Sequence, residues 1–270
     1  LNPSLKGSEK KLASYIINNA ESMIYQSLNE VAFKSKVSEA TVIRFSRKIG
    51  LKGFQDLKLH LSRDIVSPIK SIHEDIEESD DPKTIVVKVF SSEIQTLQDT
   101  MEILDIKEIN KTVRAIENAD NVVFVGVGTS GPNTNDAYNK FIRLGLNCHC
   151  YTDSHLQVMA ASLLKKGDVV IAVSHSGSTK DPIETLQVAK KHGAVTVAIT
   201  NNSISPITSI ADIVLNTASR ETMMRSEAMA SRIAQTAIID SLYTILAMKN
   251  MEKTMEVQRA IEESIVIKQY

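Results

Sequence analysis

The spacing of apolar residues divides the chain into two parts with different periodicity. Up to about residue 65, apolar positions recur every three or four residues, which predicts helices throughout this part. From Asn121 onward, short continuous apolar runs alternate with helical stretches, a pattern typical of βαβ units. The pattern therefore predicts an all-α N-terminal domain followed by an α/β domain.

The N-terminal part has the pattern of a helix-turn-helix. Ser27-Leu-Asn-Glu30 has the spacing of a capping box, so a short helix is expected to begin there. Lys36-Val37 is predicted to form the turn, Ser38 to cap a second helix, and Gly50 to end it. The residues expected to face inward on this second helix are Val42, Ile43, Phe45 and Ile49.

The second part is expected to form a five-stranded parallel sheet flanked by helices. The predicted strands are Val122–Val125, Cys148–Tyr151, Val169–Val173, Val195–Ile199 and Ile213–Leu215. Continuous apolar runs such as Val-Val-Ile-Ala-Val are typical of strands that helices cover on both faces. The helices predicted around them are Thr84–Leu104, Ile106–Asn118, Pro132–Leu144, His155–Leu164, Asp181–His192, Ser205–Ile210, Ser226–Met248 and Glu252–Ile267.

Prolines and an acidic run mark a linker between the two parts. Pro68, the acidic run Glu74–Asp81 and Pro82 leave little apolar surface to bury. We therefore expect a helix-turn-helix domain at residues 1–66, a linker at 67–82 and an α/β domain at 83–270.

Charge is distributed unevenly between these parts, although the whole chain carries a net charge of only −1. Residues 1–66 contain eleven Lys and Arg against six Asp and Glu, whereas residues 67–270 contain twenty against twenty-six. A basic N-terminal domain on an acidic body indicates a polyanionic partner for that domain alone. Solvated lysines in chance excess are the alternative explanation.

Composition narrows the class of protein further. The hydrophobic share of 43% is enough for a full core without disulfides or metal ions. The two cysteines, Cys148 and Cys150, are expected on one face of a strand as reduced core thiols, with no Cys/His pair nearby to complete a metal site. No signal peptide or membrane-length apolar run is found, so a cytoplasmic protein without a membrane partner is expected.

The second helix of the helix-turn-helix supplies the candidate DNA-binding residues. In this motif its N-terminal residues meet base edges in the major groove of double-stranded operator DNA. We expect Arg44 to pair with guanine, Thr41 to contact a base edge or phosphate, and Ala40 to allow close approach. A helical bundle used for dimerisation is the alternative. The predicted DNA-binding residues are Ser38, Ala40, Thr41 and Arg44, with Arg47, Lys48, Lys52 and Lys58 on phosphates.

Two loops that directly follow predicted strands have phosphate-binding chemistry. Ser174-His-Ser-Gly-Ser-Thr179 offers hydroxyls, exposed amides and a helix N-terminus, and Gly177 allows close backbone approach. Gly126-Val-Gly-Thr-Ser-Gly131 matches the dinucleotide pattern G-x-G-x-x-G, but Asp153 lies beyond the expected acidic position. Two such loops favour a sugar phosphate over a dinucleotide, with turn formation and helix capping as the alternative reading.

The helix-turn-helix segments and the loop Ser174–Thr179 both resemble segments of a known family. The segments Ser8–Ile16 and Ser38–Lys58 resemble the N-terminal domain of RpiR-type regulators. That family joins this helix-turn-helix to a sugar isomerase (SIS) domain, whose phosphate loop is commonly S-x-S-G-x-[ST], as in Ser174–Thr179. The two motif blocks occur in the expected order, so the resemblance covers nearly the whole chain.

The resemblance implies roles for individual residues of the second domain. Ser174, Ser176 and Thr179 would bind phosphate, with backbone help from His175, Gly177 and Ser178, while Ser130 of the first loop would contact the sugar or phosphate. Gly128 and Thr129 of the same loop are further candidates for effector binding. Two less certain candidates are His155 and Glu227. His155 is also typical of a surface or capping residue, and Glu227 of a first-turn glutamate favoured by the helix dipole.

We therefore predict a transcription regulator of carbohydrate metabolism whose DNA affinity changes when a sugar phosphate binds. A homodimer or homotetramer is expected, because a two-fold protein matches a palindromic operator. No catalytic residue, metal ion or cofactor is assigned. The alternatives are an aldose–ketose phosphate isomerase with Glu227 or His155 as base, and a partner protein whose basic domain contacts another protein.

Overall fold

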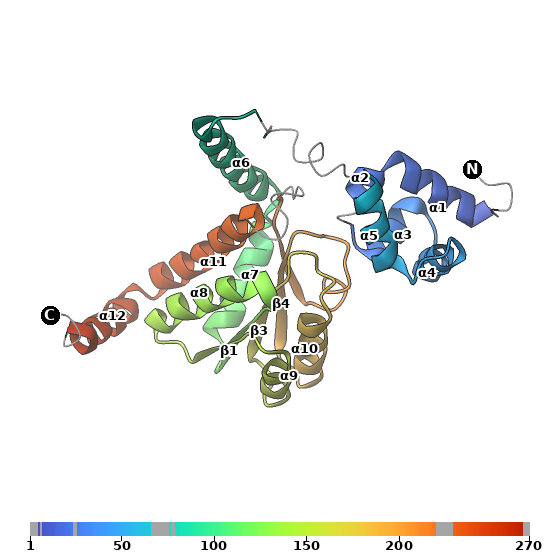
Figure 1. Cartoon of the computed structure of the whole chain (residues 1–270). Helices are drawn as coiled ribbons and strands as arrows, with labels where there is room; N and C mark the ends of the chain where they lie inside the picture. The colour runs from blue at the N-terminus through green and yellow to red at the C-terminus, as the bar shows by residue number, and fades with distance from the viewer. Residues whose placement is uncertain are drawn as a thin grey trace. The chain divides into compact units, whose positions relative to one another are not determined.

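The computed structural model describes residues 5, 7–23, 26–65, 76, 79–219 and 229–266 (Figure 1). The chain divides into two compact units, and among the described residues before position 220 the first ends at Phe90 and the second begins at Ser91. Each unit has a hydrophobic core of its own. Each is therefore described by itself.

The first unit is all helical, as the sequence predicts. Its helices are α1 (Gly7–Asn18), α2 (Ala20–Met23), α3 (Leu28–Ser35), α4 (Glu39–Lys48) and α5 (Phe54–Ile65). The capping box at α3 is confirmed, because the Glu30 amide donates to Ser27 Oγ at 3.2 Å and the Ser27 amide to Glu30 Oε2 at 2.7 Å. The one-turn helix α2 was not expected from the sequence.

The turn between α3 and α4 lies where the sequence places it. Lys36 adopts a left-handed conformation with φ of 55°, the one non-glycine residue with positive φ in the described part of the chain. Val42 and Phe45 are buried as predicted, but Ile49 is 47% exposed, so its predicted inward position is wrong. Helix α4 ends at Lys48. Ile49 follows it with a non-helical ψ of 11°, so its side chain does not continue the buried face of the helix.

The second unit contains the predicted five-stranded parallel sheet. The strands are β1 (Val122–Val125), β2 (Cys148–Tyr151), β3 (Val169–Val173), β4 (Val195–Thr200) and β5 (Ile213–Asn216). They lie in the order β2-β1-β3-β4-β5, and every neighbouring pair is parallel. The chain therefore builds the sheet outward in two directions from β1.

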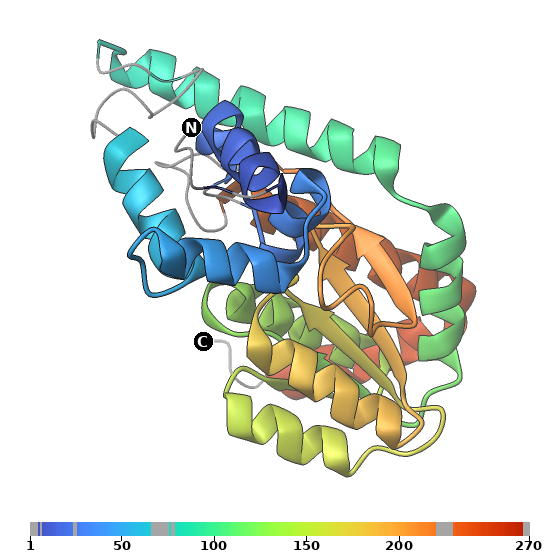
Figure 2. The same cartoon turned by 90° about the vertical axis from the view of Figure 1, so that its right-hand side faces the viewer.

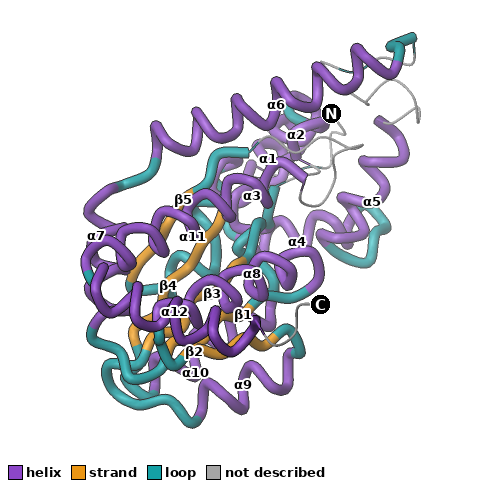
Figure 3. The backbone as a smooth tube through the Cα atoms, turned by 90° about the vertical axis from the view of Figure 1, so that its left-hand side faces the viewer, coloured by secondary structure: helices purple, strands orange, loops and turns teal. Residues whose placement is uncertain are grey.

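Alternating side chains of each strand enter two separate cores. Val122 and Phe124 pack on one face with α7 (Ile106–Glu117), α8 (Gly131–Phe141) and α11 (Met229–Lys249). The other face packs with α9 (Ser154–Ser162) and α10 (Lys180–Lys191). Figure 3 shows the strands between these two helical layers. This double coverage explains why the strands read as unbroken apolar runs.

Two further long helices precede and follow these elements in the sequence. Helix α6 (Pro82–Ile103) begins in the first unit and continues into the second, and α12 (Met251–Val266) follows α11. Short 3₁₀ turns occur at Gly128–Ser130 and Ile142–Leu144. In the described ranges, none of the helices is long and apolar enough to span a membrane.

The helix predicted at Ser205–Ile210 is wrong, because this segment forms consecutive turns. Side chains take over the local backbone groups: the Ser205 amide donates to Thr208 Oγ1 at 3.1 Å, and Thr208 Oγ1 donates to the Ser205 carbonyl at 2.8 Å. Hydroxyl side chains that bond nearby backbone compete with helix formation.

The cysteines are free thiols, as expected. Cys148 is buried and Cys150 half-buried, and both pack against the core that contains α8. Burial raises the pKa of the Cys148 thiol to about 11, with a further contribution from neighbouring Cys150. Over the described residues, no group of three or more His, Cys, Asp and Glu side chains is placed to hold a metal ion.

Candidate functional site

The two predicted phosphate loops leave neighbouring strands at the same edge of the sheet. Strands β1 and β3 pair directly, with Val122 opposite Val169 and Val125 opposite Ala172. The strand order changes direction between them, because β2 lies on one side of β1 and β3 to β5 on the other. In open parallel sheets, such a switch point at the carboxyl ends of the strands is the usual place for a ligand.

The loop after β3 is held by the carboxyl end of β4 and by the segment that follows it. The Ser174 amide donates to the Ile199 carbonyl at 3.0 Å, Thr200 Oγ1 donates to the His175 carbonyl at 3.1 Å, and the Ile207 amide donates to the Gly177 carbonyl at 3.0 Å. These bonds leave little freedom in the backbone path. The loop is thus preformed by contacts within the second unit.

Gly177 is required at its position in this loop. Its φ of 63° lies in the left-handed region that side chains disfavour. A Cβ there would lie 2.2 Å from Ser205 Oγ and 3.0 Å from Thr200 Oγ1. Both the conformation and the space therefore exclude a side chain.

A buried hydroxyl marks the start of the same loop. Ser174 is only 3% exposed, and its Oγ has no hydrogen-bond partner among the described residues. An unsatisfied buried polar group costs about 1–3 kcal/mol, so it indicates a partner that the polypeptide does not supply. Ser176 and Ser178 are exposed and Thr179 is half-buried, with Ser178 donating its amide to Ser176 Oγ at 3.2 Å.

The helices that begin at these two loops lack side-chain caps. Thr179 precedes α10 and Ser130 precedes α8, and neither side chain bonds an amide of the first turn. By contrast, Asp153 caps α9 by accepting from the Leu156 amide at 3.0 Å, and Asp105 caps α7 in the same way. The uncapped amides of α10 carry the partial positive charge of the helix N-terminus, which suits an anion. At α8 fewer amides are free, because the Gly131 amide donates to the Gly128 carbonyl and Pro132 has no amide hydrogen.

A buried glutamine holds the loop after β1 in place through hydrogen bonds. Gln157 Nε2 donates to the Gly126 carbonyl at 3.3 Å and to the Tyr151 carbonyl at 3.0 Å, while Thr185 Oγ1 donates to Gln157 Oε1 at 3.4 Å. The predicted residues of this loop differ in exposure: Gly128 and Thr129 are exposed, and Ser130 is half-buried.

A polar cluster at the carboxyl ends of β4 and β5 was not predicted from the sequence. Asn201 Oδ1 accepts from the Ser219 amide at 2.6 Å and from Thr217 Oγ1 at 3.3 Å. Asn216 Oδ1 is buried with no hydrogen-bond partner among the described residues, like Ser174 Oγ. Asn201 follows β4 directly, as Ser174 follows β3, so the position of a polar residue after a strand was the available signal.

The two less certain candidates of the second domain have different outcomes. His155 lies exposed in the first turn of α9, next to the capping residue Asp153. Glu227 lies outside the described residues. Neither is placed by the structure within the loops after β1 and β3.

The amino end of α4 in the first unit is closed by its own side chains. Ser38 Oγ accepts from the Thr41 amide at 3.3 Å and lies 2.9 Å from Thr41 Oγ1. Thr41 is only 8% exposed, whereas Ala40 and Arg44 are exposed. The exposed residues on this helix are therefore better placed than Thr41 to meet an external partner.

The four predicted phosphate-contacting cations divide into two pairs. Arg47 and Lys52 are exposed, and no ion pair of theirs occurs among the described residues. Lys48 Nζ pairs with Glu9 Oε2 at 2.7 Å, and Lys58 Nζ donates to the Gln26 carbonyl at 3.0 Å. Burial lowers the pKa of Lys58. The second pair already has partners inside the unit.

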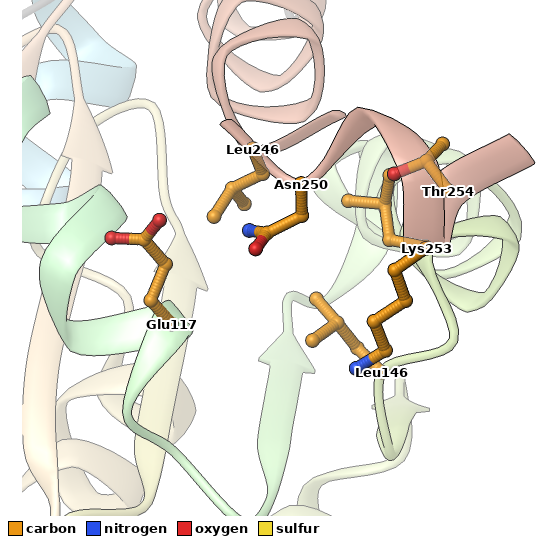
Figure 4. A pocket seen from close by; sticks show the side chains of 7 residues that line it. Glu117, Leu146, Leu246, Asn250, Lys253 and Thr254 are labelled. Carbon is orange, nitrogen blue, oxygen red and sulfur yellow. The ribbon is translucent and has the colours of Figure 1, made fainter. Parts of the chain in front are cut away.

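A separate cavity of about 150 Å³ lies at the amino ends of β1 and β2 (Figure 4). Apolar Leu144, Leu146 and Leu246 line it together with polar groups from α12. Glu117 also borders it, with its Oε2 paired to Lys249 Nζ at 2.6 Å. None of the predicted site residues lines this cavity.

Comparison with known proteins identifies both units. The model of the rpiR-family helix-turn-helix domain matches residues 2–68, and the SIS-domain model matches residues 115–245. An uncharacterized HTH-type transcriptional regulator of Caldanaerobacter subterraneus is 39% identical over 98% of this chain and 93% of its own length. The transcriptional regulator HexR of Escherichia coli K12 is 32% identical over 97% of this chain and 90% of its own length.

A solved structure agrees with this assignment over nearly the whole length. The NanR protein of Vibrio vulnificus, complexed with ManNAc-6P, has a TM-score of 0.86 and 27% identity, covering 98% of this chain and 95% of that chain. The resemblance stated from the sequence is confirmed. The chain therefore belongs to the rpiR family of helix-turn-helix transcriptional regulators, and its second unit carries a SIS domain.

Proposed function

We propose that this chain regulates genes of carbohydrate metabolism by binding operator DNA through its first unit and a sugar phosphate through its SIS domain. The proposed domain boundaries are residues 1–66 and 83–270, with 67–82 as linker. A DNA-binding regulator works where the chromosome is, in the cytoplasm. The proposed effector-binding residues are Gly128, Thr129, Ser130, His155, Ser174, His175, Ser176, Gly177, Ser178, Thr179 and Glu227.

One observation supports effector binding most strongly. At the switch point of the sheet, the buried Ser174 hydroxyl has no partner among the described residues, and the same loop leads into the amino end of α10, which Thr179 leaves uncapped. Neutral donors that converge in this way suit a phosphate. NanR, which has the same architecture, is complexed with ManNAc-6P, a sugar phosphate.

DNA binding is proposed for the exposed face of α4 and the cations around it. Arg44 lies exposed on this helix and is suited to a bidentate pair with guanine. Arg47 and Lys52 are free to meet phosphates, whereas Lys48 and Lys58 would first exchange their internal partners. The remaining proposed contacts are Ser38, Ala40 and Thr41.

Regulation requires that the sugar phosphate bind differently to two states of the protein. A ligand with equal affinity for the DNA-binding and the released state would shift neither. We place these two states in a homodimer or homotetramer, because two recognition helices related by a two-fold axis match two operator half-sites.

Thermal-shift measurements with a panel of sugar phosphates test the effector site. ManNAc-6P belongs in the panel, with other hexose and pentose phosphates and their unphosphorylated sugars as controls. At least one phosphorylated sugar is expected to raise the unfolding midpoint saturably, since a ligand of the native state stabilises it by mass action. A panel without any such shift would refute the proposal.

Variants locate the binding site on the chain. Ser174→Ala combined with Thr179→Ala is expected to remove the shift, while Ser162→Ala, an exposed serine of α9, keeps it. DNA binding of the double variant in the absence of sugar is expected to stay unchanged. Retention of the full shift by the double variant would move the site elsewhere.

A turnover assay separates the regulator from an isomerase. The effector that gives the thermal shift is incubated with the protein and followed by phosphorus NMR. We expect the sugar phosphate to be bound and recovered without conversion. Catalytic interconversion to the ketose or aldose isomer would establish an enzyme instead.

A further inference from the structure

The cavity at the amino ends of β1 and β2 lies at the opposite edge of the sheet from the two predicted phosphate loops, which follow the carboxyl ends of β1 and β3. Its walls come from α7, α11, α12 and the segment before β2. Figure 2 shows α9 and α10 in front of the sheet and the orange-red helices α11 and α12 behind it. The cavity is therefore separate from the proposed effector site.

Three leucines form the apolar wall of the cavity. Leu144 and Leu246 are buried and belong to the core of this face of the sheet, and Leu146 is half-buried. A volume of about 150 Å³ accommodates a molecule of the size of benzene, with about six non-hydrogen atoms. An inorganic ion alone would leave the leucines without a partner, so the cavity suits a small organic molecule with a hydrocarbon part.

The amino end of α12 supplies hydrogen-bond donors and positive charge to the same cavity. Asn250 directly precedes this helix, and Lys253 and Thr254 belong to its first turn. The amides of Met251, Glu252 and Lys253 have no backbone acceptor among the described residues, as is usual for a first helical turn. Lys253 is exposed, and no ion pair of it occurs in the ranges that the structure describes. An anionic group is therefore favoured at this end of the cavity.

The hydroxyl of Thr254 is an independent indication of a ligand. Thr254 lines the cavity and is only 6% exposed, yet its Oγ1 makes no hydrogen bond with any described residue. Its amide already donates to the Asn250 carbonyl at 2.9 Å, so the hydroxyl is the polar group that still needs a partner. Figure 4 shows its oxygen on the side that faces Asn250, another residue of the cavity wall.

A carboxylate on the cavity wall, that of Glu117, is already neutralised. Its Oε2 pairs with Lys249 Nζ at 2.6 Å, and Figure 4 shows Glu117 across the cavity from Lys253. Glu252, in the first turn of α12, is not among the described residues that line the cavity. The charge that remains for a ligand is the positive charge of Lys253 and of the helix end.

We propose that this cavity binds a small aliphatic carboxylate of about three to five carbons that carries an oxygen on carbon 2, a 2-hydroxy or 2-oxo acid. The carboxylate lies at Lys253 and the first-turn amides of α12. The oxygen on carbon 2 exchanges hydrogen bonds with Thr254 and Asn250, whose side chains can both donate and accept. The hydrocarbon end lies against Leu146 and the two buried leucines.

Ligand-observed NMR on the full chain, without DNA or sugar phosphate, tests this site with 2-hydroxybutyrate as the probe. Saturation transfer from the protein to its methyl protons reports contact with the leucines, and a Kd of about 0.1–1 mM is expected for a ligand of this size. Butyrate, which lacks the oxygen on carbon 2, should bind about 5-fold more weakly. 2-Hydroxybutyramide, which lacks the charge, should bind about 10-fold more weakly or worse.

Variants place the site on the chain. Lys253→Gln is expected to weaken binding of 2-hydroxybutyrate about 10-fold, and Thr254→Val to remove most of the difference between 2-hydroxybutyrate and butyrate. Leu146→Phe fills the cavity and should abolish the methyl signal. Lys107→Gln is the matched control, because Lys107 is an exposed first-turn lysine of a helix that Asp105 caps, and it does not line the cavity.

Three results would overturn the proposal: no saturable transfer to 2-hydroxybutyrate, equal affinity for its amide, or equal affinities of Lys253→Gln and Lys107→Gln. The unfolding midpoint checks that each variant folds, and the two substitutions in the first turn of α12 decide the outcome if Leu146→Phe does not. Ser174→Ala combined with Thr179→Ala should bind 2-hydroxybutyrate as the unaltered chain does. Failure at this cavity is thus distinguishable from failure of the effector site.

Discussion

The amino end of α4 in the first unit and those of α8 and α10 in the second are built in opposite ways. Ser38 closes the end of α4, and long exposed side chains such as Arg44 carry its positive charge. Ser130 and Thr179 do not cap α8 and α10 with their side chains, and the donors offered at these loops are backbone amides and short hydroxyls. Side-chain charge can be changed without altering a fold, whereas backbone donors depend on the path of the chain.

The largest effect is expected where the backbone path itself is altered. Gly177→Ala should destabilise the second unit by about 2–4 kcal/mol, because it combines a left-handed conformation with a collision against Ser205. Gly128→Ala is the matched control, since Gly128 also has positive φ but no atom within 4 Å of the added Cβ, and should cost only about 1 kcal/mol.

Chemical denaturation measures both glycine variants. Equal losses for the two would show that the contact with Ser205 contributes nothing and that the loop is less tightly held than its hydrogen bonds indicate. Sugar-phosphate binding should be lost in Gly177→Ala, because the loop amides move with the backbone.

A smaller effect is expected from a cation of the first unit, and on binding alone. Arg44→Ala should weaken operator binding by about 1–3 kcal/mol, roughly 5- to 150-fold, with the free energy of unfolding changed by less than about 0.5 kcal/mol. Fluorescence anisotropy with the duplex upstream of the gene measures the affinity. An operator affinity equal to that of the unaltered chain would show that Arg44 does not contact the DNA.

The capping difference itself can be measured on two hydroxyls. Ser38→Ala should cost about 1 kcal/mol in the unfolding of the first unit, because the Thr41 amide loses its acceptor. Thr179→Ala removes no cap and should change the unfolding of the second unit by less than about 0.5 kcal/mol. A comparable loss of unfolding free energy in both variants would show that the two helix ends do not differ in side-chain capping.

The smallest expected effect concerns the salt dependence of DNA binding. Arg47→Ala should reduce the slope of log affinity against log salt by about 1, because one phosphate contact is lost. Lys48→Ala should reduce it less, since Lys48 gives up its pair with Glu9 when it contacts DNA. Titrations at several salt concentrations compare the two, and an unchanged slope in Arg47→Ala would count against its phosphate contact.

Most of the fold follows from the sequence, because the sheet is covered on both faces. Val169–Val173 is an unbroken apolar run between polar residues, and such runs admit few other interpretations in a βαβ pattern. The helix expected at Ser205–Ile210 failed because Ser205 and Thr208 bond the backbone with their side chains. That competition depends on local geometry, which residue spacing does not reveal.

The candidate site was predicted only in part. The loops after β1 and β3 follow from the motif and from the rule that strand ends hold ligands. The burial of Thr41 was missed, because the residue spacing does not reveal that its hydroxyl lies 2.9 Å from Ser38 Oγ, against the capping residue of its own helix. The support given by Gln157 was also missed, since it joins residues that are distant in the sequence.

Gln157 connects the first loop to the helical layer on one face of the sheet. Its amide group contacts the Gly126 carbonyl on one side and Thr185 of α10 on the other. A shift of about 1 Å in Gly126 would carry its bond beyond the usual hydrogen-bond range unless α9 moved with it. The glutamine therefore couples small displacements at the carboxyl end of β1 to α9 and α10. These two helices contain no predicted effector-binding residue other than His155.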